Sequence, residues 1–364
     1  MTEQFFKNQL KVVELASVLA GPAVGMFFAE LGAEVIKIEN KKTGGDMTRT
    51  WKLPSEDPAS PYSAYYASVN WNKKTYLLDL EEAGGREQVC ELLRDADIVI
   101  TNYRTKVAQK LGVDYETLSK LNSRLIFAQL NAFDEHSERP AFDVVLQAEA
   151  GFLYMNGEAD GPPVKMPVAL IDVLAAHQLK EGILLALLHR MQTGEGSYVS
   201  TSLFESAVAS LVNQATNWLM EGYIPQRMGT KHPNIAPYGD MYQCHNGKAV
   251  LLAVGTEKQF KHLCEILDLP GLLKDESFNT NVARVKNREA LNKVLAEKIV
   301  HFEAVSLLEK LEKKGVPAAS IRTMQEVFDL PTAQAMVLEE RLSDGTAGKR
   351  VKTVAFNFHP KNKQ

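Results

Sequence analysis

Cysteine is scarce and widely spaced in this chain of 364 residues. Only Cys90, Cys244 and Cys264 occur, and no two of them form the C-x-x-C pair that is typical of zinc or redox sites. An odd number of distant thiols also excludes a dense disulfide framework. We therefore expect buried or idle thiols, and no cysteine metal site.

An excess of charge of one sign is also missing. The 41 basic and 45 acidic residues give a formal net charge of -4, which does not indicate a nucleic-acid or anionic-membrane binder. No run of about 18 apolar residues occurs, and the first ten residues lack the basic and apolar regions of a signal peptide. We expect a soluble, cytoplasmic protein whose length suits two domains.

A dinucleotide-binding loop is the third absence. Strand patterns alternate with helical patterns in the first half, and this alternation predicts an α/β fold with a Rossmann-like parallel sheet. A dehydrogenase of this fold, with Glu39 on the ribose, needs G-x-G-x-x-G after the first strand. The loop here reads LAGPAVG, and Pro22 has no N–H to offer a pyrophosphate, so a dehydrogenase is disfavoured. The expected strands are 12–15, 34–39, 76–80, 97–101 and 125–130, with a first helix at 23–31.

The rear half has a different pattern. A helical pattern at 204–220 precedes a polar linker, and a hairpin at 241–254 is closed by Asn246-Gly247, a pair suited to a type I′ turn. Helical patterns follow at 257–267, 286–300 and 304–314, and a strand-like segment at 350–358. We expect a large α/β domain at 1–225, a small α+β domain at 226–322, and a return to the large domain at 323–364.

The segment 167–205 contains the most suggestive carboxylate. Residues 168–171 (VALI) predict a short buried strand, Asp172 follows, and apolar residues then recur at helical spacing up to the TGEG turn. Asp172 would lie at the N-cap, where backbone N–H groups and the helix dipole favour its ionised form. Two interpretations follow from these residues alone: Asp172 is only a cap, or it is a carboxylate nucleophile.

Several short motifs lie in register with this segment. They are Ala20-Gly21-Pro22, LGAEVIKIE at 31–39, GDMTR at 45–49, NWNKK at 70–74, DIVITN at 97–102, LGVDYE at 111–116 and RMQTGEG at 190–196. Together they resemble the class III coenzyme A transferases (CaiB/BaiF type), which include formyl-CoA transferase and carnitine CoA-transferase. The resemblance covers nearly the whole chain. It implies a chain of two domains that forms a ring interlinked with a second copy in a homodimer.

The resemblance also implies site residues. Asp172 would carry the acyl group, and Asp143 would orient it or serve only as a turn carboxylate. Basic groups suit the phosphates of CoA, although near-motif cations such as Lys73, Lys74 and Lys106 could equally be solvated. The residues implied to line the CoA site are Leu19, Ala20, Asn40, Leu78, Asp79, Leu80, Asn102, Tyr103, Arg104, Lys110 and Arg139.

The chain also departs from formyl-CoA transferase. Leu19 replaces a glutamine that shields the small acyl intermediate there, and Met228-Gly229-Thr230 is all that remains of a glycine-rich loop. Lys110 and Asn40 stand where that family member has arginines. A lysine at such a position offers a point charge in place of the two parallel hydrogen bonds of an arginine. Because Leu19 cannot hydrogen-bond a second small carboxylate, we expect a larger, more apolar acid than oxalate or formate.

The implied reaction moves CoA from an acyl-CoA donor to a free carboxylic acid through an aspartyl mixed anhydride and an aspartyl-CoA thioester. CoA is then a substrate, with no metal or prosthetic group. A 2-methylacyl-CoA racemase of the same fold is the alternative, but it needs a histidine base where Phe142 stands. His136 is displaced, and His177 lies on the helix after Asp172. A non-enzymatic CoA-binding module would not need Asp172.

Overall fold

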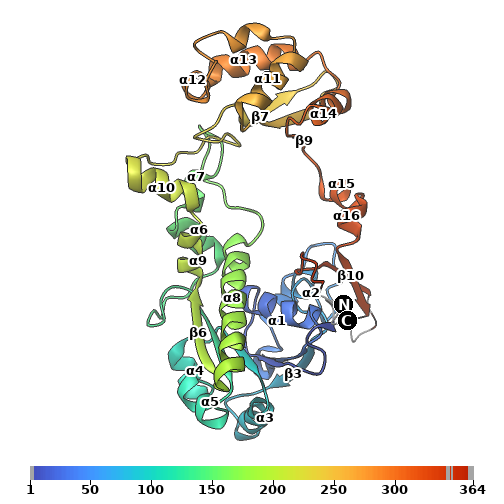
Figure 1. Ribbon diagram of the computed structural model, residues 1–364. Helices are drawn as coiled ribbons and strands as arrows, with labels where there is room; N and C mark the ends of the chain where they lie inside the picture. Colours follow the sequence, from blue (N-terminus) through green and yellow to red (C-terminus); the bar gives the residue numbers. More distant parts are fainter. Residues whose placement is uncertain (1–3, 342–344, 346, 360–364) are drawn as a thin grey trace, which may run out of the picture. The chain divides into compact units, whose positions relative to one another are not determined.

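The computed structural model describes residues 4–341, 345 and 347–359 (Figure 1). The chain divides into two compact units. The first comprises Met1–Gly151, Met166–Val212 and Thr332–Gln364, and the second comprises Phe152–Lys165 and Asn213–Pro331. The functional domain boundaries after residues 225 and 322 stay predictions.

The first unit is built on a six-stranded sheet in the order β3-β2-β1-β4-β5-β6. Every neighbouring pair is parallel, which confirms the predicted Rossmann-like α/β class. Most residues of β1 and β4 are buried, the carboxylate of Glu14 included, because helices cover both faces of the sheet. The strands are β1 Lys11–Glu14, β2 Glu34–Asn40, β3 Lys74–Leu78, β4 Ile98–Thr101, β5 Ile126–Asn131 and β6 Ser197–Ser202.

Two sets of helices cover this sheet (Figure 1). One face packs against α3 (Ala83–Arg94), α4 (Thr105–Leu111) and α5 (Tyr115–Leu121), which share an apolar core with the inward residues of β1 and β2. The other face packs against α1 (Ala20–Glu30) and the 24-residue helix α8 (Leu170–Thr193), which also contact each other. Shorter helices α2 (Ala64–Ala67), α6 (Asp143–Glu149) and α9 (Leu203–Ala209) lie in the same unit, with 3-10 turns η2 (Lys41–Thr43) and η3 (Met47–Thr50).

Helix α1 begins three residues earlier than predicted, at Ala20. Its first four N–H groups have no partner within the helix, so Pro22 is tolerated in the first turn instead of ending a loop. A Cβ at Gly21 would lie 2.4 Å from the Cβ of Ala16, so this turn needs glycine. All eleven residues of α1 are buried.

The described end of the chain packs on α1. Strands β10 (Val337–Arg341) and β11 (Ala347–Val351) form an antiparallel pair. The predicted strand at 350–358 is wrong beyond residue 351, because the N–H groups of Thr353 and Val354 both donate to the carboxylate of Glu30, each at 2.8 Å.

The second unit holds an antiparallel sheet in the order β7-β8-β9 and the helices that cover it. The predicted helix at 204–220 is two helices, α9 and α10, and the hairpin turn is not type I′, because only Gly247 has a positive φ, at 72°. The elements are α7 Phe152–Met155, α10 Val212–Glu221, β7 Tyr238–Gln243, β8 Ala249–Ala253, α11 Glu257–Ile266, η4 Pro270–Leu273, α12 Asn281–Lys286, α13 Arg288–Ile299, α14 Ala304–Lys313, β9 Ala318–Ser320 and α15 Met324–Phe328. Helix α16 (Pro331–Gln334) begins at the last residue of this unit and continues into the first unit.

None of the helices within the described residues combines the length and apolar character needed to cross a bilayer.

Candidate active site

Asp172 lies in the first turn of α8 and is 7% exposed. The helix begins at Leu170, and residues 162–169 contain no strand, so the predicted strand at 168–171 is wrong. Asp172 is therefore the third helical residue and not the N-cap. The N-cap residue is Ala169, which has no side chain able to cap the helix.

The cap of α8 comes from another helix. Oδ1 of Asp143, the first residue of α6, accepts hydrogen bonds from the backbone N–H groups of Ile171 at 2.7 Å and Asp172 at 3.3 Å. Its Oδ2 accepts from the side chain of Gln147, one helical turn later. Three donors on one carboxylate match its ionised form, which can only accept. The structure thus brings the two predicted carboxylates together.

The pKa of Asp172 is raised from 3.8 to about 7, first by burial and then by the negative charge of Asp143. The expectation that the helix terminus would favour the ionised form is therefore wrong, because Asp143 already uses the N–H groups of that turn. A carboxylate with such a pKa is a stronger base than an exposed one, and it is still largely ionised slightly above neutral pH. Perturbed acids of this kind concentrate at functional sites.

An aromatic cluster, defined here as Trp51, Tyr65 and Phe142, adjoins the carboxylate pair. The Trp51 ring centroid lies 5.1 Å from that of Tyr65 and 6.1 Å from that of Phe142. The pKa of Tyr65 is raised to about 12 by burial and then by the charges of Asp172, Asp143 and Asp46. Trp51 and Phe142 are 38% and 52% exposed, so they present apolar surface beside a reactive carboxylate.

The turn after β1 is held from two sides. The side chain of Asn102 accepts from the N–H of Ser17 at 3.2 Å and donates to its carbonyl at 3.0 Å. The carboxylate of Asp46 accepts from the N–H of Val18, whose φ of 74° is unusual for a β-branched residue. Asp46 is in turn paired with the wholly buried Lys37 at 3.1 Å. These contacts fix the backbone immediately before Leu19.

The residues implied to bind CoA follow the carboxyl ends of neighbouring strands. Leu19 and Ala20 follow β1, Asn40 ends β2 opposite Leu78 of β3, and Asn102 follows β4. Parallel strands place these ends at one edge of the sheet, where such folds bind ligands. The sheet therefore gathers this set, although its role in binding stays a prediction.

Several members of the set already have local partners. Asn40 caps η2 by accepting from the N–H of Lys42 at 2.9 Å. Asp79 accepts from the N–H of Glu81 at 2.9 Å and pairs with Lys42 at 3.2 Å. Leu80 is buried in the core, and the carbonyl of Tyr103 accepts from the side chain of Gln129 at 3.0 Å.

The predicted cations are exposed and paired. Lys110 forms an ion pair with Glu81 at 2.8 Å, and Arg139 forms one with Glu149. Arg139 also lies over the ring of Phe133, 4.2 Å from its centroid. Nη1 of Arg104 donates to the carbonyl of Glu138 at 3.2 Å. Because these side chains are already exposed, each could leave its present partner and bind a phosphate without moving a charge out of the protein interior.

Lys73 and Lys74 have other positions. The side chain of Lys73 is wholly buried and pairs with Glu14 at 2.7 Å, so it belongs to the interior of the sheet. Lys74 pairs with Glu34 at the start of β2.

Comparison with known proteins identifies the family. The model of CoA-transferase family III matches residues 8–364. The chain belongs to this family. Succinate–glutarate CoA-transferase of Agrobacterium fabrum is 37% identical over 352 residues, covering 94% of this chain and 87% of that protein. Acetyl-CoA:oxalate CoA-transferase of Acetobacter aceti is 33% identical, covering 90% and 83%. The crystal structure of a CaiB/BaiF family protein from Brucella suis is 37% identical, with a TM-score of 0.80, covering 96% and 91%. The predicted enzyme class is thus confirmed.

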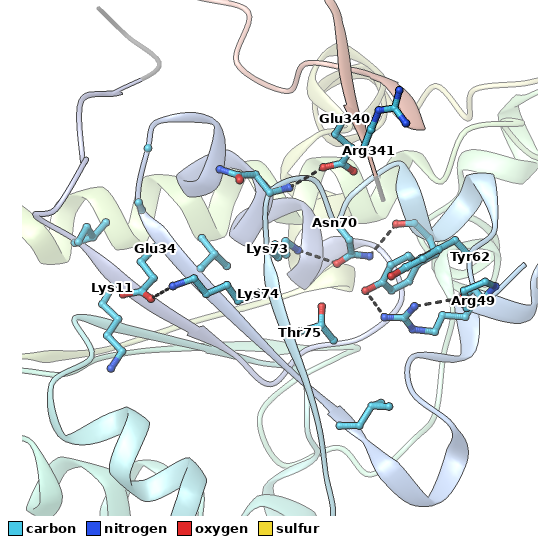
Figure 2. A pocket seen from close by; sticks show the side chains of 18 of the residues that line it. Lys11, Glu34, Arg49, Tyr62, Asn70, Lys73, Lys74, Thr75, Glu340 and Arg341 are labelled. Atoms are coloured by element: carbon cyan, nitrogen blue, oxygen red, sulfur yellow. Dashed lines mark hydrogen bonds and ion pairs between the residues drawn. The ribbon is translucent and has the colours of Figure 1, made fainter. Parts of the chain in front are cut away.

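A large cavity of the transferase, about 1550 Å³, lies away from these residues (Figure 2). It opens at the amino ends of β1, β2 and β3, and Lys11, Glu34, Lys74 and Glu340 are among its lining residues. None of the residues predicted for catalysis or CoA binding lines it. The cavity also reaches Gly44, Thr50 and Leu77, but neither Asp143 nor Asp172 lines it. The buried acid with the raised pKa, Asp172, marks the carboxyl edge as the candidate active site.

Two features of the transferase site were missed by sequence reasoning. Gln147 was not singled out, although its spacing of four residues from Asp143 places both on one helix face. Trp51 and Tyr65 carry no signal in the sequence that separates them from core aromatics. In the part of the chain that the structure describes, no cluster of three or more His, Cys, Asp or Glu residues could hold a metal ion.

Proposed function

We propose that this transferase uses Asp172 as a covalent nucleophile to move CoA from an acyl-CoA to a free carboxylic acid. The observation that carries the proposal is the buried position of Asp172 beside Asp143, which raises its pKa to about 7. A carboxylate that stays basic and is shielded from water is suited to attack a thioester. The aromatic cluster offers the adjoining acyl group an apolar surface.

The proposed reaction has four steps. An oxygen of Asp172 attacks the donor carbonyl and the C–S bond breaks. The CoA thiolate departs, and a mixed anhydride between Asp172 and the acyl group remains. The thiolate attacks the Asp172 carbonyl carbon, which releases the donor acid and forms an aspartyl-CoA thioester. The acceptor carboxylate displaces the thiolate to form a second anhydride. The thiolate then attacks the acceptor carbonyl, which yields the new acyl-CoA and restores the Asp172 carboxylate.

Asp143 contributes to these steps through its charge. Residue 172 is uncharged in both the anhydride and the thioester, so the burial and repulsion that oppose its carboxylate do not oppose the covalent states. The rise in the pKa of Asp172 from 3.8 to about 7 corresponds to about 4 kcal/mol. This destabilisation of the resting carboxylate favours acylation, because it is relieved when residue 172 becomes neutral.

We propose an acceptor in the size class of succinate and glutarate. Support comes from the exposed apolar surfaces of Trp51 and Phe142, which can contact methylene groups, and from the name of the Agrobacterium relative. A panel of free acids, incubated with acetyl-CoA and succinyl-CoA as donors and analysed by mass spectrometry, tests this choice. We expect succinyl-CoA from the acetyl-CoA donor and glutaryl-CoA from either donor as the main products, and a preference for oxalate or formate would contradict the proposal.

A trapping experiment tests the covalent step. Hydroxylamine added during turnover should attack the activated carbonyl of Asp172 and leave a hydroxamate on that side chain, visible as a mass change in its peptide. The same treatment without acyl-CoA serves as the control. An active enzyme that forms no adduct on this peptide would contradict a covalent role for Asp172.

We also propose that the transferase acts as a homodimer. An exposed apolar stripe on α8, defined by Leu184, Leu185, Leu188 and Met191, supports this, since two of these side chains are 70% and 83% exposed. Light scattering at micromolar concentration should give the mass of a dimer, and Leu185→Glu should shift it toward a monomer. A stable monomer of the unchanged protein would overturn the proposal.

A further inference from the structure

We propose that Gln147 is a positioning residue of the transferase, which holds Asp143 and the segment before α8 so that Asp172 faces the substrate. The proposal rests on the function proposed above for Asp172. Gln147 lies on α6 and has no exposed surface. Buried amides are costly unless all their groups are bonded, so the partners of this side chain indicate its role.

Both ends of the amide are occupied. Nε2 of Gln147 donates to Oδ2 of Asp143, and Oε1 accepts from the backbone N–H of Met166 at 2.9 Å. The opposite orientation of the amide would place its oxygen against a carboxylate and its NH₂ against an N–H group. The network therefore permits a single orientation of Gln147.

These two bonds form a clamp around the start of α8. Asp143 holds the N–H groups of Ile171 and Asp172, while Gln147 holds both Asp143 and the backbone five residues before Ile171. Helix α8 has no capping side chain of its own. The position of Asp172 thus depends on two residues of α6, and Gln147 joins them to the irregular segment at 162–169.

Gln147 also supplies a donor to the charge of Asp143. The pKa of Tyr65 on α2 responds to the charges of both carboxylates and to that of Asp46, the N-cap residue of η3. On α8, His177 and Lys180 interact with Glu181, and Lys180 also interacts with Glu30 of α1. On α9, Glu205 bonds to Ser202. The donors to Asp143 are the N–H groups of Ile171 and Asp172 and the amide of Gln147.

Two variants separate positioning from packing. Gln147→Met keeps the volume and removes both hydrogen bonds. Gln147→Glu keeps both bonds while the new side chain is protonated, because its O–H can donate to Asp143 and its carbonyl can accept from Met166. When this glutamic acid ionises, it loses the donor and repels Asp143. Asn122→Leu is the matched control: Asn122 donates to the carbonyls of Leu93 and Ala96, at 3.1 and 2.9 Å, near the opposite edge of the sheet.

We expect kcat of Gln147→Met to fall about 10- to 100-fold, the usual effect of a small misplacement of a reacting group, with KM for acyl-CoA within about twofold. Activity of the unchanged enzyme should rise with pH through about 7 as Asp172 ionises. Gln147→Glu should instead give a bell-shaped profile, with activity lost on the alkaline side. Asn122→Leu should lower the melting temperature and keep the rising profile.

Two results would overturn the proposal. In one, Gln147→Glu keeps the rate and the single rising limb of the unchanged enzyme. In the other, Asn122→Leu loses as much kcat as Gln147→Met at an equal loss of thermal stability. If Gln147→Met does not fold, Gln147→Glu alone decides. Failure of the underlying function is distinguishable, because Asp172→Asn would then remain active whatever the Gln147 variants do.

Discussion

Both edges of the six-stranded sheet hold ion pairs, but the carboxyl edge also holds the carboxylate pair Asp143–Asp172, which has no cation among the described residues. At the amino edge, oppositely charged side chains line a large cavity and neutralise each other, as Lys74 and Glu34 do at 2.7 Å (Figure 2). At the carboxyl edge, two buried carboxylates lie together. In the described part of the chain, no ion pair involves either Asp143 or Asp172.

This difference separates structural charge from functional charge. A paired surface charge contributes about 0–1 kcal/mol to stability. A buried carboxylate beside a second one is destabilised, and such a group persists where the chemistry uses it. The size of a cavity carries no such information. The following predictions test the contrast, from the largest expected effect to the smallest.

The first prediction concerns the nucleophile. Asp172→Asn and Asp172→Ala should both lose turnover by about 10³-fold or more, because neither side chain can form the anhydride. Steady-state assays with succinyl-CoA measure the loss. Asp95→Asn is the matched control at the amino edge, since Asp95 is paired with Lys11 and its loss should change kcat less than about twofold. An active Asp172→Asn enzyme would show that the carboxylate at the carboxyl edge is no more necessary for turnover than Asp95 at the amino edge.

The second prediction is that the destabilisation at Asp172 depends on pH. The folded pKa is about 7, whereas an unfolded aspartate titrates near 3.9, so the folded state holds more protons between these values. The free energy of unfolding should therefore fall as pH rises from about 4 to 7. Asp172→Asn lacks this titration and should be more stable than the unchanged protein by up to about 4 kcal/mol at pH 8. The gap should close near pH 4.

Urea unfolding at pH 5 and pH 8 measures this gap. Asp95→Asn should show no comparable growth with pH, because Asp95 is largely exposed. Equal urea midpoints for Asp172→Asn and the unchanged protein at pH 8 would mean that Asp172 is not destabilised in the folded state.

The third prediction concerns the cations of the carboxyl edge. Lys110→Ala and Arg139→Ala should each weaken CoA binding about 10- to 150-fold, since one hydrogen bond to a charged group contributes about 1.5–3 kcal/mol. Each side chain must leave Glu81 or Glu149 to reach a phosphate, so the effect should shrink as salt rises. Calorimetry measures the affinity, with Lys349→Ala as the control, because Lys349 of β11 pairs with Glu339 of β10. Unchanged affinity in both variants would identify them as solvated surface charges.

The fold of the first unit could be predicted because its signals are local. Strand β4 is a short apolar run, β1 has Val12 and Val13 at its centre, and each helix between strands carries its own periodicity. The nucleotide-cofactor alternative was also excluded locally, by Pro22 in the first turn of α1. Asp172 itself could be singled out through motifs that lie in register.

The properties of the site could not be predicted because they are non-local. The cap of α8 comes from Asp143, 29 residues before Asp172, and the same residue raises the pKa of Asp172. The sequence offered Lys73 as a possible phosphate-binding residue, but in the fold it pairs with Glu14, 59 residues away. Burial and charge partners of this kind exist only after the elements have packed.

The last and smallest effect is expected at the amino edge. Lys74 and Glu34 line the cavity, and their side chains are 66% and 44% exposed, so their ion pair is well screened by water. Lys74→Ala and Glu34→Gln should each change stability by less than about 1 kcal/mol and kcat by less than about twofold. Urea unfolding and the succinyl-CoA assay measure both quantities. The double variant should behave as the sum of the single ones within about 0.5 kcal/mol, since a screened pair has little coupling energy. A large loss of turnover in either single variant would place substrate chemistry in the cavity, and the carboxyl edge would lose its claim to be the active site.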